Sequence, residues 1–298
     1  MTFDDNRWLP SEDSHLREPK ADAEPSSLQT PPASTEPLVA AGPVLPDDLR
    51  VPWDWMDLVL FVLLYFLGLV LIGVLTGAGF AAFGISPEQL RTTASYKGLF
   101  VILSQVILSV AVLVYLAAQM RHRFAAPFWR TIGWRPLDTH GAPHASAYLK
   151  FAITGFFLSM VVQFASASVQ TKTKLPIEDL FQDKRSAILL MLTAVTVAPI
   201  VEETIFRGYI YPVIARRFGI RTSIVVTGTL FGMLHAAQLW GGWAQIALLI
   251  LVGIVFTYVR SQTRTVLASY LVHLGYNTFP LVIFFVATHG LKNFPAGS

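Results

Sequence analysis

The stretch LVLFVLLYFLGLVLIGVLTGAGFAAF, residues 58–83, decides the fold class. It contains 26 consecutive residues without a charge, and a helix needs about 20 apolar residues to cross a bilayer. Six further apolar blocks follow along the chain, at 98–120, 147–169, 186–215, 222–240, 243–259 and 265–287, and the 243–259 block is the shortest. The sequence therefore predicts an all-α protein, a polytopic transmembrane helical bundle of about seven spans.

The chain ahead of the first span has a different composition. Residues 1–57 contain twelve Asp and Glu against four Lys and Arg, although the whole chain has a net charge of +3. Few large apolar side chains occur there, so burial cannot offset the entropy lost on ordering. We expect residues 1–50 to be a disordered, acidic and Pro-rich tail, and residues 51–298 to form the transmembrane helical domain.

The arginines of the loops predict an orientation in the membrane. Lys and Arg are enriched on the cytoplasmic side of membrane proteins. A cytoplasmic N-terminus places one set of arginines on that side: Arg121, Arg123, Arg130, Arg135, Arg216, Arg217, Arg221, Arg260 and Arg264. Because membrane topology accounts for these charges, we expect membrane lipid around the chain and no nucleic-acid partner. The expected location is the plasma membrane of a bacterium, with the N-terminus cytoplasmic.

Polar residues interrupt three of the apolar spans. An ionisable residue at the centre of a span costs at least about 2.5 kcal/mol, so each one needs a partner or a function. The three groups are Glu202, Glu203 and Arg207 in the fourth span, Phe231 and His235 in the fifth, and His273 and Asn277 in the seventh. The chain has no cysteine, which excludes disulfides, thiolate metal sites and a cysteine nucleophile.

Helix geometry separates the two adjacent glutamates. Glu203 and Arg207 are four residues apart and share a face, whereas Glu202 points about 100° away. Arg207 can therefore neutralise Glu203 and leave Glu202 free. Pro199 should kink the helix beside Glu202 and open it to water or substrate. The alternative is that both carboxylates are structural and fix helix packing through one arginine.

The two histidines allow a structural and a catalytic interpretation. Gly228, Gly232 and His235 follow a 0, 4, 7 spacing, so another helix can approach closely on the face that carries the imidazole. His273 and Asn277 are four apart, which suits mutual packing or two donors aimed at one oxygen. A single histidine in an apolar helix more often hydrogen-bonds a neighbouring helix. Because the carboxylate, the imidazoles and the amide all fall near mid-span, we expect them to converge inside the bundle.

Taken together, the three groups resemble a known family. Glu202-Glu203-x-x-x-Arg207, Phe231-x-x-x-His235 and His273-x-x-x-Asn277 stand in this order on separate apolar helices. This pattern resembles the CPBP family, the CAAX prenyl protease and bacteriocin-processing family, also called the Abi or type II CAAX protease family. The resemblance covers about residues 145–290 and leaves the first two spans and the tail outside it.

The resemblance implies a glutamate-dependent intramembrane endopeptidase that hydrolyses a peptide bond at the membrane. Matched to the family, Glu202 resembles the general base and His235 its partner on the attacking water. His273 and Asn277 resemble the oxyanion site. The supporting residues are Glu203, Arg207 and Phe231. The implied substrate is a peptide or protein with a membrane-proximal segment, and prenylated proteins are one candidate class.

Other interpretations stay open. A metal-dependent protease would bind zinc through Glu202, His235 and His273 and use Glu203 as base. Against it, the sequence has no His-Glu-x-x-His motif, and Glu203 would have to leave Arg207. We therefore expect no cofactor, with zinc as the alternative.

Two alternatives are not enzymes. A proton-coupled transporter or channel would use mid-membrane His and Glu as relays, but inverted repeats are missing from the sequence. A non-catalytic membrane immunity or scaffold protein of the same fold would stay functional when the polar groups are replaced.

Overall fold

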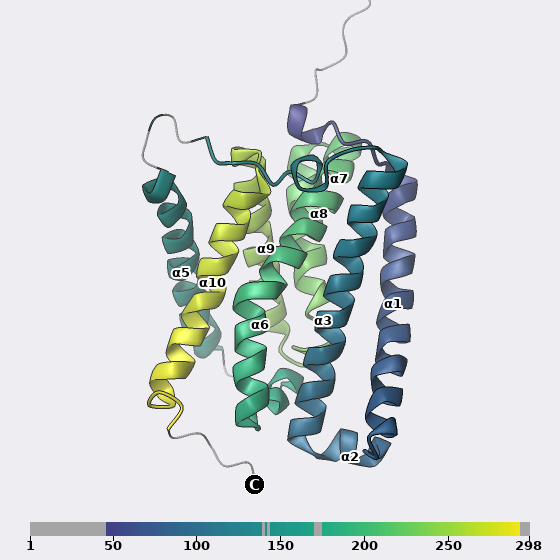
Figure 1. The fold of residues 1–298 in the computed structure, drawn as a ribbon. Helices are drawn as coiled ribbons and strands as arrows, with labels where there is room; N and C mark the ends of the chain where they lie inside the picture. The colour runs from purple at the N-terminus through teal and green to yellow at the C-terminus, as the bar shows by residue number, and fades with distance from the viewer. Residues whose placement is uncertain (1–45, 139–140, 142–143, 170–174, 293–298) are drawn as a thin grey trace, which may run out of the picture. The chain divides into compact units, whose positions relative to one another are not determined.

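The computed structural model describes residues 46–138, 141, 144–169 and 175–292. All regular elements in this part of the chain are helices (Figure 1). Six helical segments are long and apolar enough to cross a membrane. They are α1 (Trp55–Ala82), α3 (Ala94–Ala118), α5 (His144–Ser168), α6 (Lys184–Glu203) continued by α7 (Tyr211–Phe218), α9 (Trp243–Thr263) and α10 (Val266–Ala287). The predicted all-α transmembrane class is confirmed, and the chain is an integral membrane protein.

Short elements join the long helices. The 3-10 turns are η1 (Asp47–Leu49) and η3 (Pro176–Phe181), the short α-helices are α2 (Pro87–Thr92) and α4 (Phe128–Thr131), and the π-helical segments are η2 (Gln119–Arg123) and η4 (Thr204–Ile210). The segment η4 joins α6 to α7 without a break in the chain's helical path. The predicted fourth span therefore contains a widened turn.

The fifth apolar helix is shorter than the predicted 222–240 block. Helix α8 (Ile220–Leu234) has 15 residues, fewer than a bilayer crossing needs. Helix α9, predicted as the shortest span, has 21 residues. The chain turns after Leu234 toward Gly241, whose φ of +92° suits glycine because a side chain would be strained there. The bundle therefore has six long helices and one short one, and His235 follows the end of α8.

The folded part begins before the predicted boundary of the tail. Residues 1–45 of the predicted disordered tail lie outside the described residues. The next residues include η1, where Leu49 is buried against Tyr211 and Ala215. Asp48 forms an ion pair with Arg260 at 2.8 Å, and both side chains are buried. Residues 46–50 are thus held on the bundle by an apolar contact and a buried charge pair.

Glycines let the helices around the later motifs approach closely. A Cβ at Gly228 or Gly232 would lie 2.5 or 2.7 Å from the backbone nitrogen of Ile254 or Ile250 on α9. The predicted close approach on this face of α8 is confirmed. A Cβ at Gly155 of α5 would meet a backbone oxygen of α10 at 1.8 Å, so α5 supports the helix that carries His273 and Asn277.

The arginine-rich loops lie at one end of the bundle (Figure 1). Arg123 pairs with Asp57 at the start of α1, at 2.5 Å. Arg216 donates hydrogen bonds to the carbonyl oxygens of Val51 and Trp53, at 2.8 and 2.5 Å. The prediction that these loops share one side is confirmed. That this side is cytoplasmic stays a prediction.

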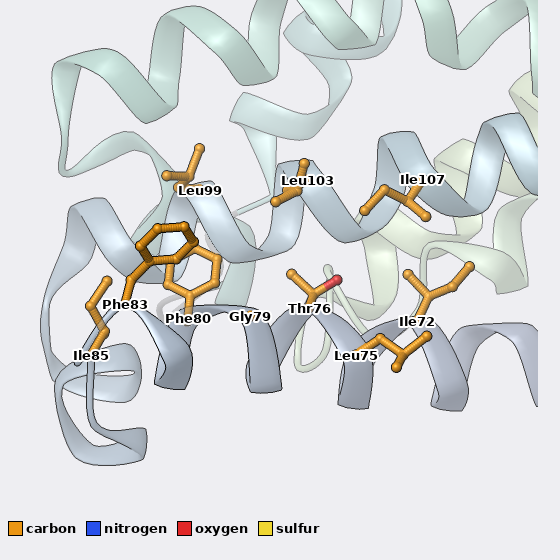
Figure 2. Close-up of a pocket in the computed structure, with 10 residues that line it drawn as sticks. All are labelled: Ile72, Leu75, Thr76, Gly79, Phe80, Phe83, Ile85, Leu99, Leu103 and Ile107. Atoms are coloured by element: carbon orange, nitrogen blue, oxygen red, sulfur yellow. The ribbon is translucent and has the colours of Figure 1, made fainter.

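A spacious apolar cavity lies away from all three motifs. It has a volume of about 530 Å³ and lies between α1 and α3 (Figure 2). Thr76 contributes its polar hydroxyl. The other lining residues are apolar: Ile72, Leu75, Gly79, Phe80, Phe83, Ile85, Leu99, Leu103 and Ile107. Without an ionisable side chain, this cavity has no group for acid–base chemistry.

Candidate active site

Helix α6 presents the first motif at its C-terminal end. Asp183 caps the helix by accepting a hydrogen bond from the backbone of Ser186 at 2.8 Å. Pro199 lies inside the last turn and cannot donate to the carbonyl of Val195. The π-helical segment η4 begins directly after Glu203, and such widened turns are frequent at functional sites. Helix α6 thus continues past Pro199 and widens after Glu203, and the predicted opening beside Glu202 stays a prediction.

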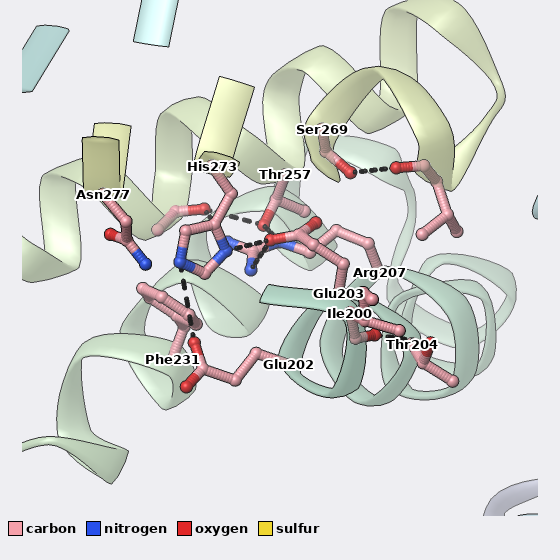
Figure 3. A network of polar contacts seen from close by, with 12 residues as sticks. Ile200, Glu202, Glu203, Thr204, Arg207, Phe231, Thr257, Ser269, His273 and Asn277 are labelled. Atoms are coloured by element: carbon pink, nitrogen blue, oxygen red, sulfur yellow. Dashed lines mark hydrogen bonds and ion pairs between the residues drawn. The ribbon is translucent and has the colours of Figure 1, made fainter. Parts of the chain in front are cut away.

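Glu203 lies in a closed polar network (Figure 3). Its side chain has no exposed surface, and its Oε1 atom lies 2.9 Å from Nη1 of Arg207. The same oxygen lies 3.0 Å from Nδ1 of His273. The predicted pairing with Arg207 is present, and the bond to His273 is a contact that the sequence did not indicate.

Arg207 is held from α9 as well as by Glu203. Its Nε donates to Oγ1 of Thr257 at 3.2 Å, and its Nη2 donates to the carbonyl of Gly253 at 2.8 Å. The guanidinium carbon lies 4.5 Å from the ring centroid of Phe231, within the range of a cation–π contact. These partners satisfy a fully buried cation, which would be costly if unpaired.

Glu202 has a different environment from its neighbour. Its side chain keeps 14% of its surface exposed. Its Oε1 lies 3.8 Å from Nε2 of His235, and its Oε2 lies 3.7 Å from Nε2 of His273. Both separations are longer than a direct hydrogen bond, so a water can contact the carboxylate and an imidazole together. Among the described residues, no arginine forms an ion pair with Glu202, as the helical spacing predicted.

Hydrogen bonds on the far side of each ring fix the imidazole tautomers. Nδ1 of His235 lies 3.0 Å from the carbonyl oxygen of Phe231, and Nδ1 of His273 lies 3.0 Å from a carboxylate oxygen of Glu203. Carbonyl and carboxylate oxygens only accept, so we assign the hydrogen to Nδ1 in both rings. The Nε2 atom of each ring then faces Glu202.

Asn277 lies one helical turn beyond His273 on α10. Its Nδ2 donates to the carbonyl of Ala194 on α6, at 2.8 Å. A primary amide has two hydrogens on this nitrogen, so one remains for a second acceptor. The bond to Ala194 fixes the orientation of the amide.

These side chains line a second cavity, with a volume of about 310 Å³. Five of the predicted site residues contribute to its wall: Glu202, Phe231, His235, His273 and Asn277. Glu203 and Arg207 stand behind this wall and are fully buried. The structure therefore brings the predicted acid–base groups to one cavity and places the supporting ion pair outside it.

Two observations on the described residues concern the zinc alternative. Among them, no group of three or more His, Asp or Glu side chains is placed to hold a metal ion. Glu203, the base of that alternative, is engaged by Arg207 and His273. Whether the protein uses a metal stays a prediction, with zinc as the alternative.

Sequence reasoning missed the contribution of α9. Thr257 is fully buried, and its hydroxyl also donates to the carbonyl of Gly253 at 2.8 Å. Threonines in helices commonly bond the carbonyl four residues back, so a single Thr in an apolar span carries no distinctive signal. Only the three-dimensional packing shows that the Thr257 hydroxyl accepts a hydrogen bond from Arg207.

The fold and the site define a class of protein: a polytopic membrane protein whose helices gather a carboxylate and two imidazoles at one cavity. Residues 184–279 match the family model described as Type II CAAX prenyl endopeptidase Rce1-like. This match confirms, for this segment, the resemblance drawn from the three motifs. The matched segment contains all seven motif residues and is shorter than the expected 145–290.

A curated relative and the solved structures complete the comparison. The chain is 21% identical to the "Putative membrane peptidase YdiL" of Bacillus subtilis (strain 168), over 77% of this chain and 88% of the relative. No solved structure matches the chain. The relative's name agrees with the reaction class of the matched family.

Proposed function

We propose that the chain is a membrane-embedded endopeptidase in which Glu202 is the general base. One observation carries the proposal: the two carboxylate oxygens of Glu202 face Nε2 of His235 and Nε2 of His273, at 3.8 and 3.7 Å, at one cavity. The match of residues 184–279 to a membrane protease family supports the same reaction class. Glu203 is unsuited to the role because its partners already neutralise it.

Water activation uses Glu202 and His235. A water between them donates one hydrogen to the carboxylate and the other to the lone pair of the His235 Nε2 atom. As its oxygen attacks the scissile carbonyl carbon, Glu202 takes the proton. Positioned acid–base groups of this kind contribute about 10²- to 10⁴-fold to a rate. The Nδ1 bond to the carbonyl of Phe231 keeps the imidazole in the accepting tautomer.

The tetrahedral intermediate needs hydrogen-bond donors for its oxyanion. Asn277 offers the second hydrogen of Nδ2, with the amide held in place by Ala194. His273, as an imidazolium, donates from Nε2 while its Nδ1 hydrogen stays on Glu203. Donors fixed before the reaction starts stabilise developing charge without reorganisation.

Collapse of the intermediate completes the reaction. Glu202 returns its proton to the nitrogen of the scissile bond, the carbon–nitrogen bond breaks, and the oxyanion electrons re-form the carbonyl. The products are a carboxylic acid, which keeps the second hydrogen of the water, and an amine; the acid then gives its proton to the amine or to bulk water. Water has then been added across the peptide bond, and Glu202 is again ionised.

The proposed setting follows from the membrane helices and the loop charges. The substrate is a peptide or protein whose scissile bond lies close to the bilayer, and prenylated proteins are one class to test. The proposed location is a bacterial plasma membrane with the N-terminus in the cytoplasm, which matches the cluster of arginines at one end of the bundle.

Comparison of membrane proteomes tests the proposed function. Cells with the wild-type chain and cells with Glu202→Gln, at equal protein level, should differ in the terminal fragments of a small set of membrane-associated proteins. The purified wild type, and not the variant, should then cleave peptides that span these sites. Identical fragment profiles with a preserved cellular phenotype would favour a scaffold or transporter and contradict the proposal.

A further inference from the structure

Gln105 is a primary amide near the middle of an apolar span. It is residue 12 of the 25 in α3. None of the hydrogen bonds among the described residues uses its side-chain amide. Polar groups at membrane depth are expensive unless they meet a partner or line a wet cavity. Gln105 belongs to the second case, because it lines the same cavity as Glu202.

The packing of α3 on α6 directs Gln105 toward this cavity. A Cβ at Gly98 of α3 would lie 2.3 Å from Oγ of Ser186 on α6, so the two helices nearly touch there. Gln105 is seven residues beyond Gly98, about two turns, and shares its face. The two helices run in the same direction, since Lys97 at the start of α3 pairs with Asp179 ahead of α6, at 2.6 Å.

The same register gives the depth of Gln105 relative to the proposed base. Seven residues beyond Ser186 on α6 is Thr193, which also lines the cavity. Glu202 is nine residues further, about 13 Å along the helix axis. An extended peptide covers this distance with about four residues. Gln105 therefore lies where the backbone of a substrate would pass on its way to Glu202.

Gln238 is a second amide on the wall of this cavity. It follows His235 by three residues in the turn after α8, and its side chain is exposed. The backbone carbonyl oxygen of Gln238 accepts a hydrogen bond from the backbone N–H of Ile177 in η3, at 3.1 Å. The backbone is thus anchored, while no hydrogen bond within the described part of the chain engages its side-chain amide.

The chemistry of the wall defines what these amides can bind. A primary amide accepts one hydrogen bond and donates others, which complements the N–H and C=O of a peptide backbone. Most of the remaining wall is apolar and includes Leu190, Met191, Ala194, Ala198, Leu249 and Pro280. Of the described residues on this wall, none is Lys or Arg, and Glu202 is the one carboxylate. An anionic substrate side chain would find no Lys or Arg among the described residues of this wall, and a cationic one could pair only with Glu202, which would occupy the proposed base.

We infer that Gln105 and Gln238 form a backbone-binding subsite for an extended, uncharged and apolar substrate segment that leads to Glu202. The inference rests on the proposed function and names the substrate class of the same cavity. The two amides bind the N–H and C=O groups of the substrate backbone, which every peptide has, and the substrate side chains lie against the apolar wall. Selection then acts on extended conformation and absence of charge within about four residues of the scissile bond.

Steady-state kinetics of the full chain in detergent test the subsite. The probe is an internally quenched peptide of Ala, Leu and Val whose cleavage requires Glu202. Gln105→Leu and Gln238→Leu should each raise KM about tenfold, the effect of losing one or two backbone hydrogen bonds, with kcat changed less than threefold. The melting temperature should not fall, because leucine suits the apolar span at Gln105 and no hydrogen bond among the described residues engages the exposed side chain of Gln238. Ser104→Ala is the matched control on α3, does not line this cavity, and should leave KM unchanged.

A backbone substitution in the probe makes the test specific. Replacing one peptide N–H at a time by an ester oxygen should raise KM of the wild type at a particular position and leave KM of Gln105→Leu unchanged there. A lysine placed within four residues of the scissile bond should lower kcat/KM at least tenfold. If Gln105→Leu unfolds, Gln105→Met replaces it in the same series.

Two failures are distinguishable in this experiment. Glu202-dependent cleavage with the same KM in the wild type and both glutamine variants would overturn the subsite and leave the proposed function standing. Equal sensitivity of wild type and variants to every ester would do the same. If the wild type cleaves no apolar peptide in a Glu202-dependent manner, the proposed function itself fails, and the subsite fails with it.

Discussion

The two sides of α6 at Glu202 and Glu203 show how adjacent carboxylates acquire different tasks. Glu203 is fully buried, and its Oε1 atom is shared by Arg207 of η4 and His273 of α10. Glu202 faces the cavity, where two imidazole Nε2 atoms lie just beyond hydrogen-bond distance. One residue of helical rotation separates a neutralised, structural carboxylate from one that can still accept a proton.

The two cavities also differ in whether an ionisable group is available for chemistry. The apolar cavity between α1 and α3 is more spacious, but its wall holds no ionisable group (Figure 2). The smaller cavity is bordered by helices packed through glycines and backed by a closed polar network (Figure 3). The two cavities therefore differ in chemistry: the cavity beside Glu202 has ionisable groups on its wall, and the cavity between α1 and α3 has none.

Loss of the Glu203 charge should have the largest effect on stability. Glu203→Gln leaves Arg207 as a buried cation without its carboxylate, which should cost about 3 kcal/mol or more of unfolding free energy. The double variant Glu203→Gln with Arg207→Met should recover part of this loss. Unfolding in detergent measures both. A single variant as stable as the wild type would show that the closed network does not hold α6 in place.

Loss of the Asp48 charge should cost somewhat less. Asp48→Asn removes the carboxylate that pairs with buried Arg260 at the end of the bundle, and we expect a loss of about 2 kcal/mol. Chains that begin at residue 46 should unfold like the full chain, whereas chains that begin at residue 51 should be destabilised. Equal melting temperatures for both truncations would contradict the role given to residues 46–50.

Glycine-to-alanine substitutions on α10 and on α1 test how tightly each helix is packed. A Cβ at Gly275 of α10 would lie 1.9 Å from the carbonyl oxygen of Ala152 on α5, so Gly275→Ala should cost about 2 kcal/mol by overpacking. It should also lower cleavage, because α10 carries His273. The control is Gly73→Ala on α1, where a Cβ has no neighbour within 4 Å among the described residues. The control should lose neither stability nor activity, and a comparable loss in both variants would show that α1 is as tightly constrained.

Chelation should have the smallest effect. Because the proposed reaction uses Glu202 and imidazoles without a metal, 1,10-phenanthroline or EDTA should leave the cleavage rate of the purified protein unchanged. The assay is peptide cleavage before and after dialysis against the chelator. Loss of activity that added zinc restores would instead support the metal-dependent alternative.

Much of the architecture could be predicted because lipid imposes simple rules on sequence. A helix must be about 20 apolar residues long to cross a bilayer, so the block at 58–83 already gave α1. The four-residue spacing of Glu203 and Arg207 predicted their ion pair, and the glycines of α8 predicted its close approach to another helix, which is α9. These features depend on neighbours in sequence or on one helix face.

The contacts that were missed join residues far apart in the chain. The bond between His273 and Glu203 and the support of Arg207 by Thr257 depend on how three helices pack together. The end of α8 was missed because the apolar block continues beyond Leu234 while the backbone turns. Asp48 was assigned to the tail because its partner is 212 residues away.

Parallel measurements on Glu202→Gln and Glu203→Gln test the central claim most directly. Peptide cleavage and thermal unfolding are recorded on the same detergent-purified samples of both variants and the wild type. The account predicts that Glu202→Gln keeps its melting temperature but loses at least about 100-fold in turnover, whereas Glu203→Gln is destabilised first. Wild-type turnover in Glu202→Gln, together with a stable but inactive Glu203→Gln, would exchange the two roles and contradict the account.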